Sequence, residues 1–316
     1  MTNNISVYKL KKESKTLLLK LFRTVLVCGV CYLLLFPLFY LVISAIQDPT
    51  SMKDPTVVWV PRALSTINFQ RAFENLNYGN SMLFTLFLSS VSTILTLLSC
   101  SMAGYGFARF NFFEKRITFI FVLLLIIVPP QTTMMSTYLN FRFFDIFGIT
   151  KLFGTESINL LGSPVTLFLP ALFANGIRAG LSIFIFRQFF LGQPKELEEA
   201  AKIDGCGIFK TYFRIMIPLS VPAIITVAVF TFVWYWNDSI YGELFFSEGT
   251  KTLAVGLSFL RNSLSDSIVS NNSFTAQEQR GILAAASLLC IIPPLVLYVI
   301  IQRKFVESIE RTGIVG

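Results

Sequence analysis

The chain has 316 residues, of which 54% are hydrophobic and only 14% are charged. Soluble domains carry roughly 25% charged residues, so this composition excludes an ordinary soluble protein and predicts an all-α polytopic membrane protein. The net charge of +8 raises the question of nucleic-acid binding, but the cations flank apolar runs and form no basic cluster interleaved with aromatics. We therefore expect no nucleic-acid partner, and interpret the cations as groups that anchor and orient the chain in membrane lipid.

Six apolar windows are long enough to cross a membrane, because a hydrocarbon core of about 30 Å takes about 20 helical residues. In chain order they are residues 24–46, 81–108, 117–140, 164–186, 218–237 and 281–302. Each window is expected to be helical, since an unpaired backbone amide in lipid costs on the order of several kcal/mol. The first window is longer than a signal-peptide core and lacks a convincing cleavage site, so we expect it to be retained.

The distribution of Lys and Arg predicts which side of the membrane each connecting segment faces. Seventeen of the 26 cations lie on one side, in residues 1–23, 105–116, 187–217 and 303–316. Eight lie on the other side, in residues 47–80, 142–163 and 238–280. Because cytoplasmic segments are enriched in Lys and Arg, the first group is predicted to be cytoplasmic, together with both termini, and the second group external.

The sequence lacks the usual machinery of an enzyme. It contains no histidine, no G-x-x-x-x-G-K-[ST] phosphate-binding loop and no G-x-S-x-G nucleophile motif. Cys28 and Cys31 form a C-x-x-C pair inside an apolar run, where thiols behave as small hydrophobic groups, so we expect no metal site. The predicted spans also hold no acidic residue of the kind found in ion-coupled carriers. We therefore expect a non-enzymatic protein without a cofactor of its own, driven by another subunit.

The segment KELEEAAKIDG, residues 195–205, is a charged and helix-prone stretch between the fourth and fifth predicted spans. Its acids favour the positive end of a helix dipole, and Glu198 and Lys202 are spaced for an i, i+4 ion pair. Gly205 predicts a left-handed turn that ends the helix. The following stretch, GIFKTYFRIMIP, predicts an amphipathic helix at the membrane boundary, with Pro218 at its junction with the fifth span.

This amphipathic helix has a predicted apolar face and a predicted polar face. The apolar face contains two neighbouring rows of side chains: Ile208, Tyr212 and Ile215, and Phe209, Phe213 and Met216. The polar face consists of Lys210, Thr211 and Arg214.

The stretch EAAKIDGCGIFKTYFRIMIP resembles the EAA loop of inner-membrane permeases of ATP-binding-cassette importers. That pattern is E-A-A, three residues, G, nine residues, I, one residue, L-P, and here Ile217 stands where Leu is usual. AGYGFARFNF at 103–112, TLAVGL at 252–257 and the tail QRKFVESIERTGIVG are similar to segments of carbohydrate permeases. The resemblance covers nearly the whole chain after about residue 20 and is to the second permease subunit of maltose-type systems.

The resemblance implies a type I importer permease core made of spans two to six, over about residues 80–305, with a cytoplasmic coupling helix. In this family the helix docks in a cleft of a separate ATPase subunit, whose closure switches the permease between inward- and outward-facing states. The contact and turn positions carried over to this sequence are Glu199, Ala200, Ala201, Asp204, Gly205 and Pro218.

The resemblance also implies the partners and the location. The partners are a second homologous permease, an ATPase dimer that binds ATP and Mg²⁺, and an extracytoplasmic sugar-binding protein. The location is the bacterial cytoplasmic membrane. By family analogy, the external segments 47–80 and 238–280 are the docking surface for the binding protein. Gly313 and Gly316 match tail glycines that belong, in the maltose relative, to a loop reaching into the complex, although a short cytoplasmic end could equally contact the ATPase.

Arg178 lies inside the fourth predicted span, and two interpretations of it stay open. It could line the solute path and hydrogen-bond sugar hydroxyls or an acidic sugar. It could instead tie backbone carbonyls at a helix break, which Asn175, Gly176 and Gly180 would permit. For the whole chain, the alternatives to a sugar importer are an importer of another solute, such as phosphate, amino acids or polyamines, and a membrane scaffold without transport.

Overall fold

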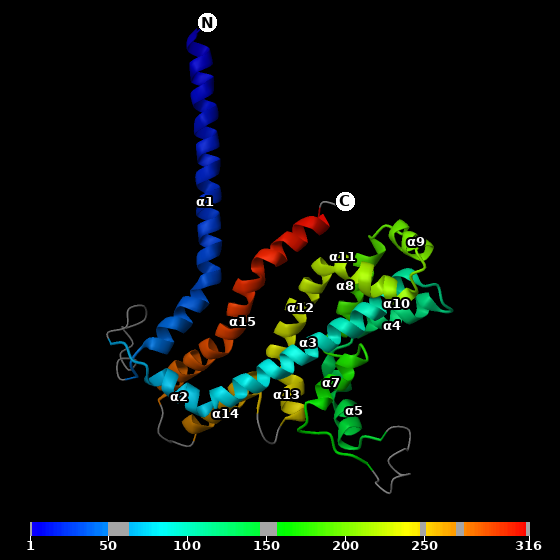
Figure 1. The fold of residues 1–316 in the computed structure, drawn as a ribbon. Coiled ribbons are helices and arrows are strands. Elements are labelled where there is room, and N and C mark those ends of the chain that lie inside the picture. Colours follow the sequence, from blue (N-terminus) through cyan, green and yellow to red (C-terminus); the bar gives the residue numbers. More distant parts are fainter. Residues whose placement is uncertain (1, 50–62, 146–156, 247–250, 270–274, 314–316) are drawn as a thin grey trace. The chain divides into compact units, whose positions relative to one another are not determined.

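The computed structural model describes residues 2–49, 63–145, 157–246, 251–269 and 275–313, and Figure 1 shows that they are almost entirely helical. Within these ranges there is no β-sheet, and two isolated bridges join Gln47 to Leu64 and Phe144 to Ile158. The predicted all-α class is therefore confirmed.

The chain divides into two units, of which the first is made of Met1–Ala72 and Leu264–Leu288. Its main element is α1 (Thr2–Ile46), which contains the predicted first span. Residues 16–40 of this helix are mostly apolar and are exposed, as expected of a helix that faces lipid.

The second unit is made of Phe73–Ser263 and Leu289–Gly316. Its longest complete helix, α3 (Tyr78–Arg109), packs against α7, α8 and α12. Gly104 lets α3 and α8 approach closely, because a Cβ at this position would lie 2.6 Å from the Cβ of Phe186. After α3 the elements are α4 (Lys115–Ile127), α5 (Pro130–Arg142), α7 (Val165–Leu172), α8 (Ala179–Leu191), α9 (Glu196–Ile203), α10 (Ile208–Thr211), the π-helical turn η2 (Tyr212–Met216), α11 (Ile217–Leu219), α12 (Val221–Trp236) and α13 (Ile240–Phe245).

Three helices contribute residues to both units: α2 (Ile67–Asn75), α14 (Leu253–Val269) and α15 (Ala276–Gly313). The external segment predicted at 238–280 therefore contains α13 and α14, and the tail predicted from 303 is helical as far as Gly313. Gly316 lies outside the described residues.

Among the described residues, three helices are long and apolar enough to cross a membrane: Thr16–Ile46, Tyr78–Arg109 and Ala276–Arg303. They overlap the first, second and sixth predicted spans. Two bent pairs, α4 with α5 and the 208–219 segment with α12, would raise the number to five if each pair were one span. The count of six spans stays a prediction.

The third and fifth predicted spans are bent where the sequence places prolines. The axes of α4 and α5 differ by 101°. Pro129 is extended, with φ −65° and ψ 138°, because the ring of Pro130 disfavours a helical conformation in the residue before it. The 208–219 segment meets α12 at 77°, next to Pro218 and Pro222.

The fourth predicted span is not one continuous helix, so the expectation of a helix throughout 164–186 is wrong. Its two parts, α7 and α8, are separated by six residues from Phe173 to Arg178. Ala174 and Arg178 both have φ 54°, a left-handed conformation that a continuous right-handed helix cannot contain. The apolar composition of residues 164–186 met the length criterion for a membrane span, but the backbone turns around Gly176.

Candidate functional site

The EAA segment folds as the short helix α9 followed by a tight turn. Gly205 has φ 75°, which confirms the predicted left-handed position. Its N–H donates to the carbonyl of Lys202, and the N–H of Cys206 donates to the carbonyl of Ala201, at 3.0 and 2.9 Å. These two bonds form a Schellman motif, which satisfies the last carbonyls of α9 and fixes where the helix ends.

The two faces of α9 have different surroundings. Glu199 and Ala200 are exposed, as is Ile203, whose exposed fraction is 86%. They lie at i, i+1 and i+4, so they form one outward face on which a partner helix or cleft could pack. Ala201 is buried and so packs within this chain, although the family pattern places it among the partner contacts. Asp204 and Gly205 are exposed at the end of the helix.

Glu198 has a different partner from the one that local spacing predicts. Its Oε1 lies 2.8 Å from Nε of Arg109, at the end of α3, and the two side chains are 12% and 4% exposed. The predicted partner Lys202 is exposed. Neither paired atom has a hydrogen bond with a favourable angle, so the contact is an ion pair stabilised by charge and by exclusion of water. Arg109 belongs to AGYGFARFNF, which the sequence analysis used only as a family resemblance.

The segment after Gly205 is not a single α-helix, since α10, η2 and α11 follow one another, and one residue of its predicted polar face is buried. Thr211, predicted to be polar-facing, is buried, whereas Phe209 and Phe213 are 69% and 53% exposed. The helix is interrupted by the π-helical turn η2, in which the N–H of Ile217 bonds to the carbonyl of Tyr212, five residues earlier. Pro218 has no N–H for a regular bond to the carbonyl four residues before it, which favours this rearrangement.

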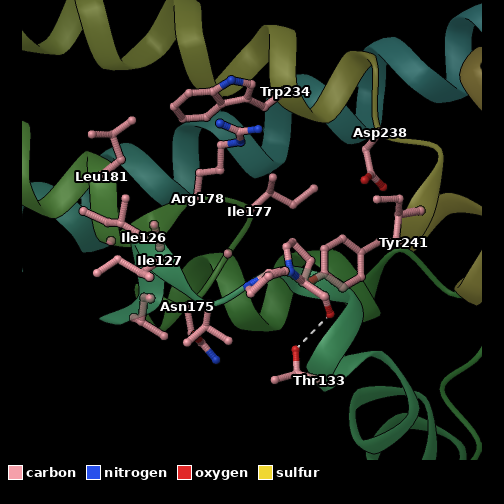
Figure 2. A pocket seen from close by; sticks show the side chains of 18 of the residues that line it. Ile126, Ile127, Thr133, Asn175, Ile177, Arg178, Leu181, Trp234, Asp238 and Tyr241 are labelled. Carbon is pink, nitrogen blue, oxygen red and sulfur yellow. Dashed lines mark hydrogen bonds between the residues drawn. The ribbon is translucent and has the colours of Figure 1, made fainter. Parts of the chain in front are cut away.

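A cavity of about 500 Å³ opens in the second unit where three helix interruptions meet. It lies between the α4–α5 bend, the α7–α8 break and the end of α12 with the residues that follow (Figure 2). Its polar and aromatic lining includes Thr133, Asn175, Arg178, Trp234, Asp238 and Tyr241. Cavities of this size with a few convergent polar groups are typical of small-molecule sites.

Arg178 lies at the start of α8 and its side chain lines this cavity. Its guanidinium is 5.1 Å from the centre of the Trp234 ring, a cation–π contact that Figure 2 shows. Each interpretation of Arg178 therefore has partial support. The residue lies at a helix break, as the second interpretation expects, but within the described residues its side chain contacts an aromatic ring and not a backbone carbonyl.

Asp238 is a cavity residue that the sequence analysis missed. Its Oδ2 accepts a hydrogen bond from the N–H of Gly242 at 3.0 Å, so it caps the short helix α13. Burial raises the pKa of Asp238 to about 6, although the bonds from the N–H groups of Gly242 and Tyr241 oppose the rise. Asp238 and Ser239 before a short apolar helix form a capping pattern, and that signal was present in the sequence.

Comparisons with known proteins bear on the family and the fold of the chain. Residues 96–311 match the family described as binding-protein-dependent transport system inner membrane component. The chain is 27% identical to the arabinooligosaccharides transport system permease protein AraQ of Halalkalibacterium halodurans, over 91% of this chain and 93% of that protein. It is 28% identical to the melibiose/raffinose/stachyose import permease protein MelC of Bacillus subtilis, over 88% and 91%.

A further relative is the osmoprotective compounds uptake permease protein GgtD of Synechocystis sp., which is 26% identical over 89% of this chain and 87% of that protein. Among solved structures, the chain is similar to one chain of a bacterial ABC transporter involved in the import of the acidic polysaccharide alginate. The TM-score is 0.70 at 17% identity, over 91% of this chain and 96% of that chain. This likeness shows that the two chains share a fold.

Proposed function

The chain belongs to the family of binding-protein-dependent transport system inner membrane components, and on that premise we propose that it is the permease subunit of an ATP-driven sugar importer. A permease of this kind is a transport component and not an enzyme in itself. It receives a sugar or oligosaccharide from an extracytoplasmic binding protein and passes it across the bacterial cytoplasmic membrane by alternating access.

The exposed face of α9 is the observation that carries this proposal. Glu199 and Ala200 face outward on a helix whose end is fixed by the Gly205 turn. A partner ATPase subunit docks on this face, and Glu199 meets a basic group there. ATP and Mg²⁺ are bound by the ATPase dimer, and a second, homologous permease completes the membrane part. The greater number of Lys and Arg on the α9 side supports a cytoplasmic location for this face and for both termini.

The cavity beside Arg178 is the proposed solute path. Its lining supplies an amide, a hydroxyl, a carboxylate and a guanidinium next to aromatic rings, a set suited to a polyhydroxylated solute. The names of two relatives, which refer to arabinooligosaccharides and to melibiose, raffinose and stachyose, support a sugar. The relative named for osmoprotective compounds favours a second candidate, an importer of another small solute.

The test is uptake by membranes that contain this chain with its binding protein, second permease and ATPase. We expect uptake of at least one of labelled melibiose, raffinose and arabino-oligosaccharides, and its loss in Glu199→Lys, because the new cation repels the basic partner group. Glu114→Lys is the matched control, since it reverses the charge of an exposed acid just before α4, outside the outward face of α9.

Two results would overturn parts of this proposal. Undiminished uptake by Glu199→Lys, at equal amounts of inserted protein, would exclude α9 as the coupling helix. Failure of the unaltered complex to take up any of the three sugars, with uptake of an osmoprotective solute, would favour the second candidate.

A further inference from the structure

The attachment of α9 to the rest of the second unit depends on very few buried groups. Of its eight residues, only Glu198 and Ala201 are buried. At its far end the chain continues through Gly205 and Gly207, which leave the backbone with little steric restraint. A helix that is pushed by a partner transmits force only if it is held firmly, so the anchor at Glu198 decides whether α9 acts as a lever.

Glu198 is held by a cluster of groups at the end of α3. Beside the ion pair with Arg109, its carboxylate interacts electrostatically with the hydroxyl of Tyr105. Nη2 of Arg109 also donates to the carbonyl of Gln193, just before α9, at 2.8 Å. The arginine therefore fixes both the side chain of α9 and the backbone that leads into it.

A second tie joins the following segment to the same part of α3. The hydroxyls of Ser101 and Tyr212 are 2.7 Å apart, and the rings of Tyr105 and Tyr212 are in contact, with centres 5.2 Å apart. Ser101, Tyr105 and Arg109 are spaced four residues apart, so they form one row along the last two turns of α3. This row therefore contacts α9 before the Gly205 turn and η2 after it.

We propose that Arg109, with Tyr105 and Glu198, is a strut that makes α9 and the end of α3 move as one body. The ATPase-driven displacement of α9 then passes directly into α3, which packs against α7, α8 and α12. In this arrangement the adjacent acids have separate tasks: Glu199 faces the partner, and Glu198 holds the lever. Arg109 and Glu198 are positioning residues, and their role in transport rests on the proposed function.

The test uses the assembled complex in proteoliposomes and two measurements. Hydrogen–deuterium exchange of the α9 amides reports the strut without any solute. The ratio of labelled raffinose taken up to ATP hydrolysed reports coupling. For Arg109→Gln we expect α9 exchange to accelerate about tenfold or more, because its main anchor is lost. We expect the uptake ratio to fall about fivefold or more while ATP hydrolysis continues.

Two further variants separate a strut from a general loss of structure. Arg116→Gln, an exposed arginine at the start of α4, should change neither measurement. The double variant Arg109→Glu with Glu198→Arg swaps the two charges, and it should restore most of the protection of the α9 amides and most of the uptake ratio. Where Arg109→Gln does not assemble, the double variant and Arg109→Lys are measured in its place.

Unchanged α9 exchange in Arg109→Gln would overturn the strut. The strut would also be overturned if Arg109→Gln lowered ATP hydrolysis and uptake in proportion and the double variant with swapped charges restored neither. If the unaltered complex takes up no raffinose, the proposed function fails for that sugar. Hydrogen–deuterium exchange of the α9 amides still decides whether the strut exists.

Discussion

In the second unit, α9 and α5 lie far from each other (Figure 1). At the α9 end an arginine and a carboxylate meet, whereas at the α5 end an arginine and a carboxylate line one cavity and stay apart. Arg109 and Glu198 are 2.8 Å apart and nearly inaccessible to water. Arg178 lies over the Trp234 ring, and Asp238 is held by backbone N–H groups. Within the described part of the chain, neither of these two charges has an ionic partner.

This difference shows that the surroundings of an arginine and a carboxylate determine what the two groups can do. A charge pair that is shielded from water has no atoms accessible to a solute, and its contribution is a rigid connection. Charges held separately by a ring and by the backbone keep donors and acceptors directed into the cavity. The α9 end is thus suited to transmit movement, and the α5 end is suited to bind.

The largest expected effect separates the two adjacent glutamates of α9. Glu198→Ala leaves the guanidinium of Arg109 buried and unpaired, which should lower the free energy of unfolding by about 3–5 kcal/mol. Glu199→Ala removes an exposed acid and should change it by less than about 0.5 kcal/mol. Thermal unfolding of the purified chain in detergent measures both. Equal effects of the two substitutions would contradict the division of α9 into a held face and a free face.

The second prediction concerns pH and the carboxylate at the cavity. Because the pKa of Asp238 is raised in the folded chain, to about 6, the folded state binds the proton more tightly than the unfolded state. Its contribution to stability is complete below the usual pKa of 3.8 and is lost as the pH rises through about 6. The size of this contribution is roughly 3 kcal/mol.

Asp238→Asn should remove this pH-dependent component, so its unfolding temperature should fall less than that of the unaltered chain between pH values of about 4 and about 6. Glu196→Gln, which changes an exposed acid of α9 away from the cavity, is the control. Identical pH profiles for the unaltered chain and Asp238→Asn would show that the Asp238 carboxyl is in contact with water.

The two ends also differ in how far the sequence predicts them. The Gly205 turn and the exposed acid of α9 follow from local rules, since a helix dipole and a left-handed glycine depend on a few neighbouring residues. The partner of Glu198 does not follow from local rules, because Arg109 is far away in sequence and the i, i+4 spacing predicts Lys202 instead.

The cavity is still less accessible to sequence reasoning. It exists only because breaks in separate helices meet in space, and a rule based on apolar length treats each window as continuous. Pro129 and Pro130 lie at one of these breaks and were a local signal for it, although the window 117–140 was predicted to be one continuous helix. Nothing local indicates that Arg178 would lie over Trp234, since that contact depends on how α8 and α12 pack.

A smaller effect tests the turn that ends α9. Gly205→Ala places a Cβ on a residue with φ 75° and should cost about 1–2 kcal/mol. Gly207→Ala is a closely matched control, because Gly207 has φ −71° and a Cβ at either position would meet no other atom. Unfolding temperatures compare the two. If both substitutions were equally harmless, α9 would not need a left-handed residue to end where it does.

A small effect on stability is expected at Arg178, and it is paired with a larger effect on transport. Arg178→Gln removes an exposed cation–π contact, which should lower the free energy of unfolding by only about 0.5–1 kcal/mol. If the guanidinium donates to a bound solute, the same change should weaken the apparent affinity for uptake about tenfold. Arg178→Lys keeps the charge over Trp234 and should preserve stability while it loses the planar donor set. Uptake at a series of sugar concentrations and thermal unfolding measure the two effects separately. Unchanged affinity and rate in Arg178→Gln, at equal amounts of protein, would assign Arg178 to the helix break alone and would remove the contrast between the two ends of this unit.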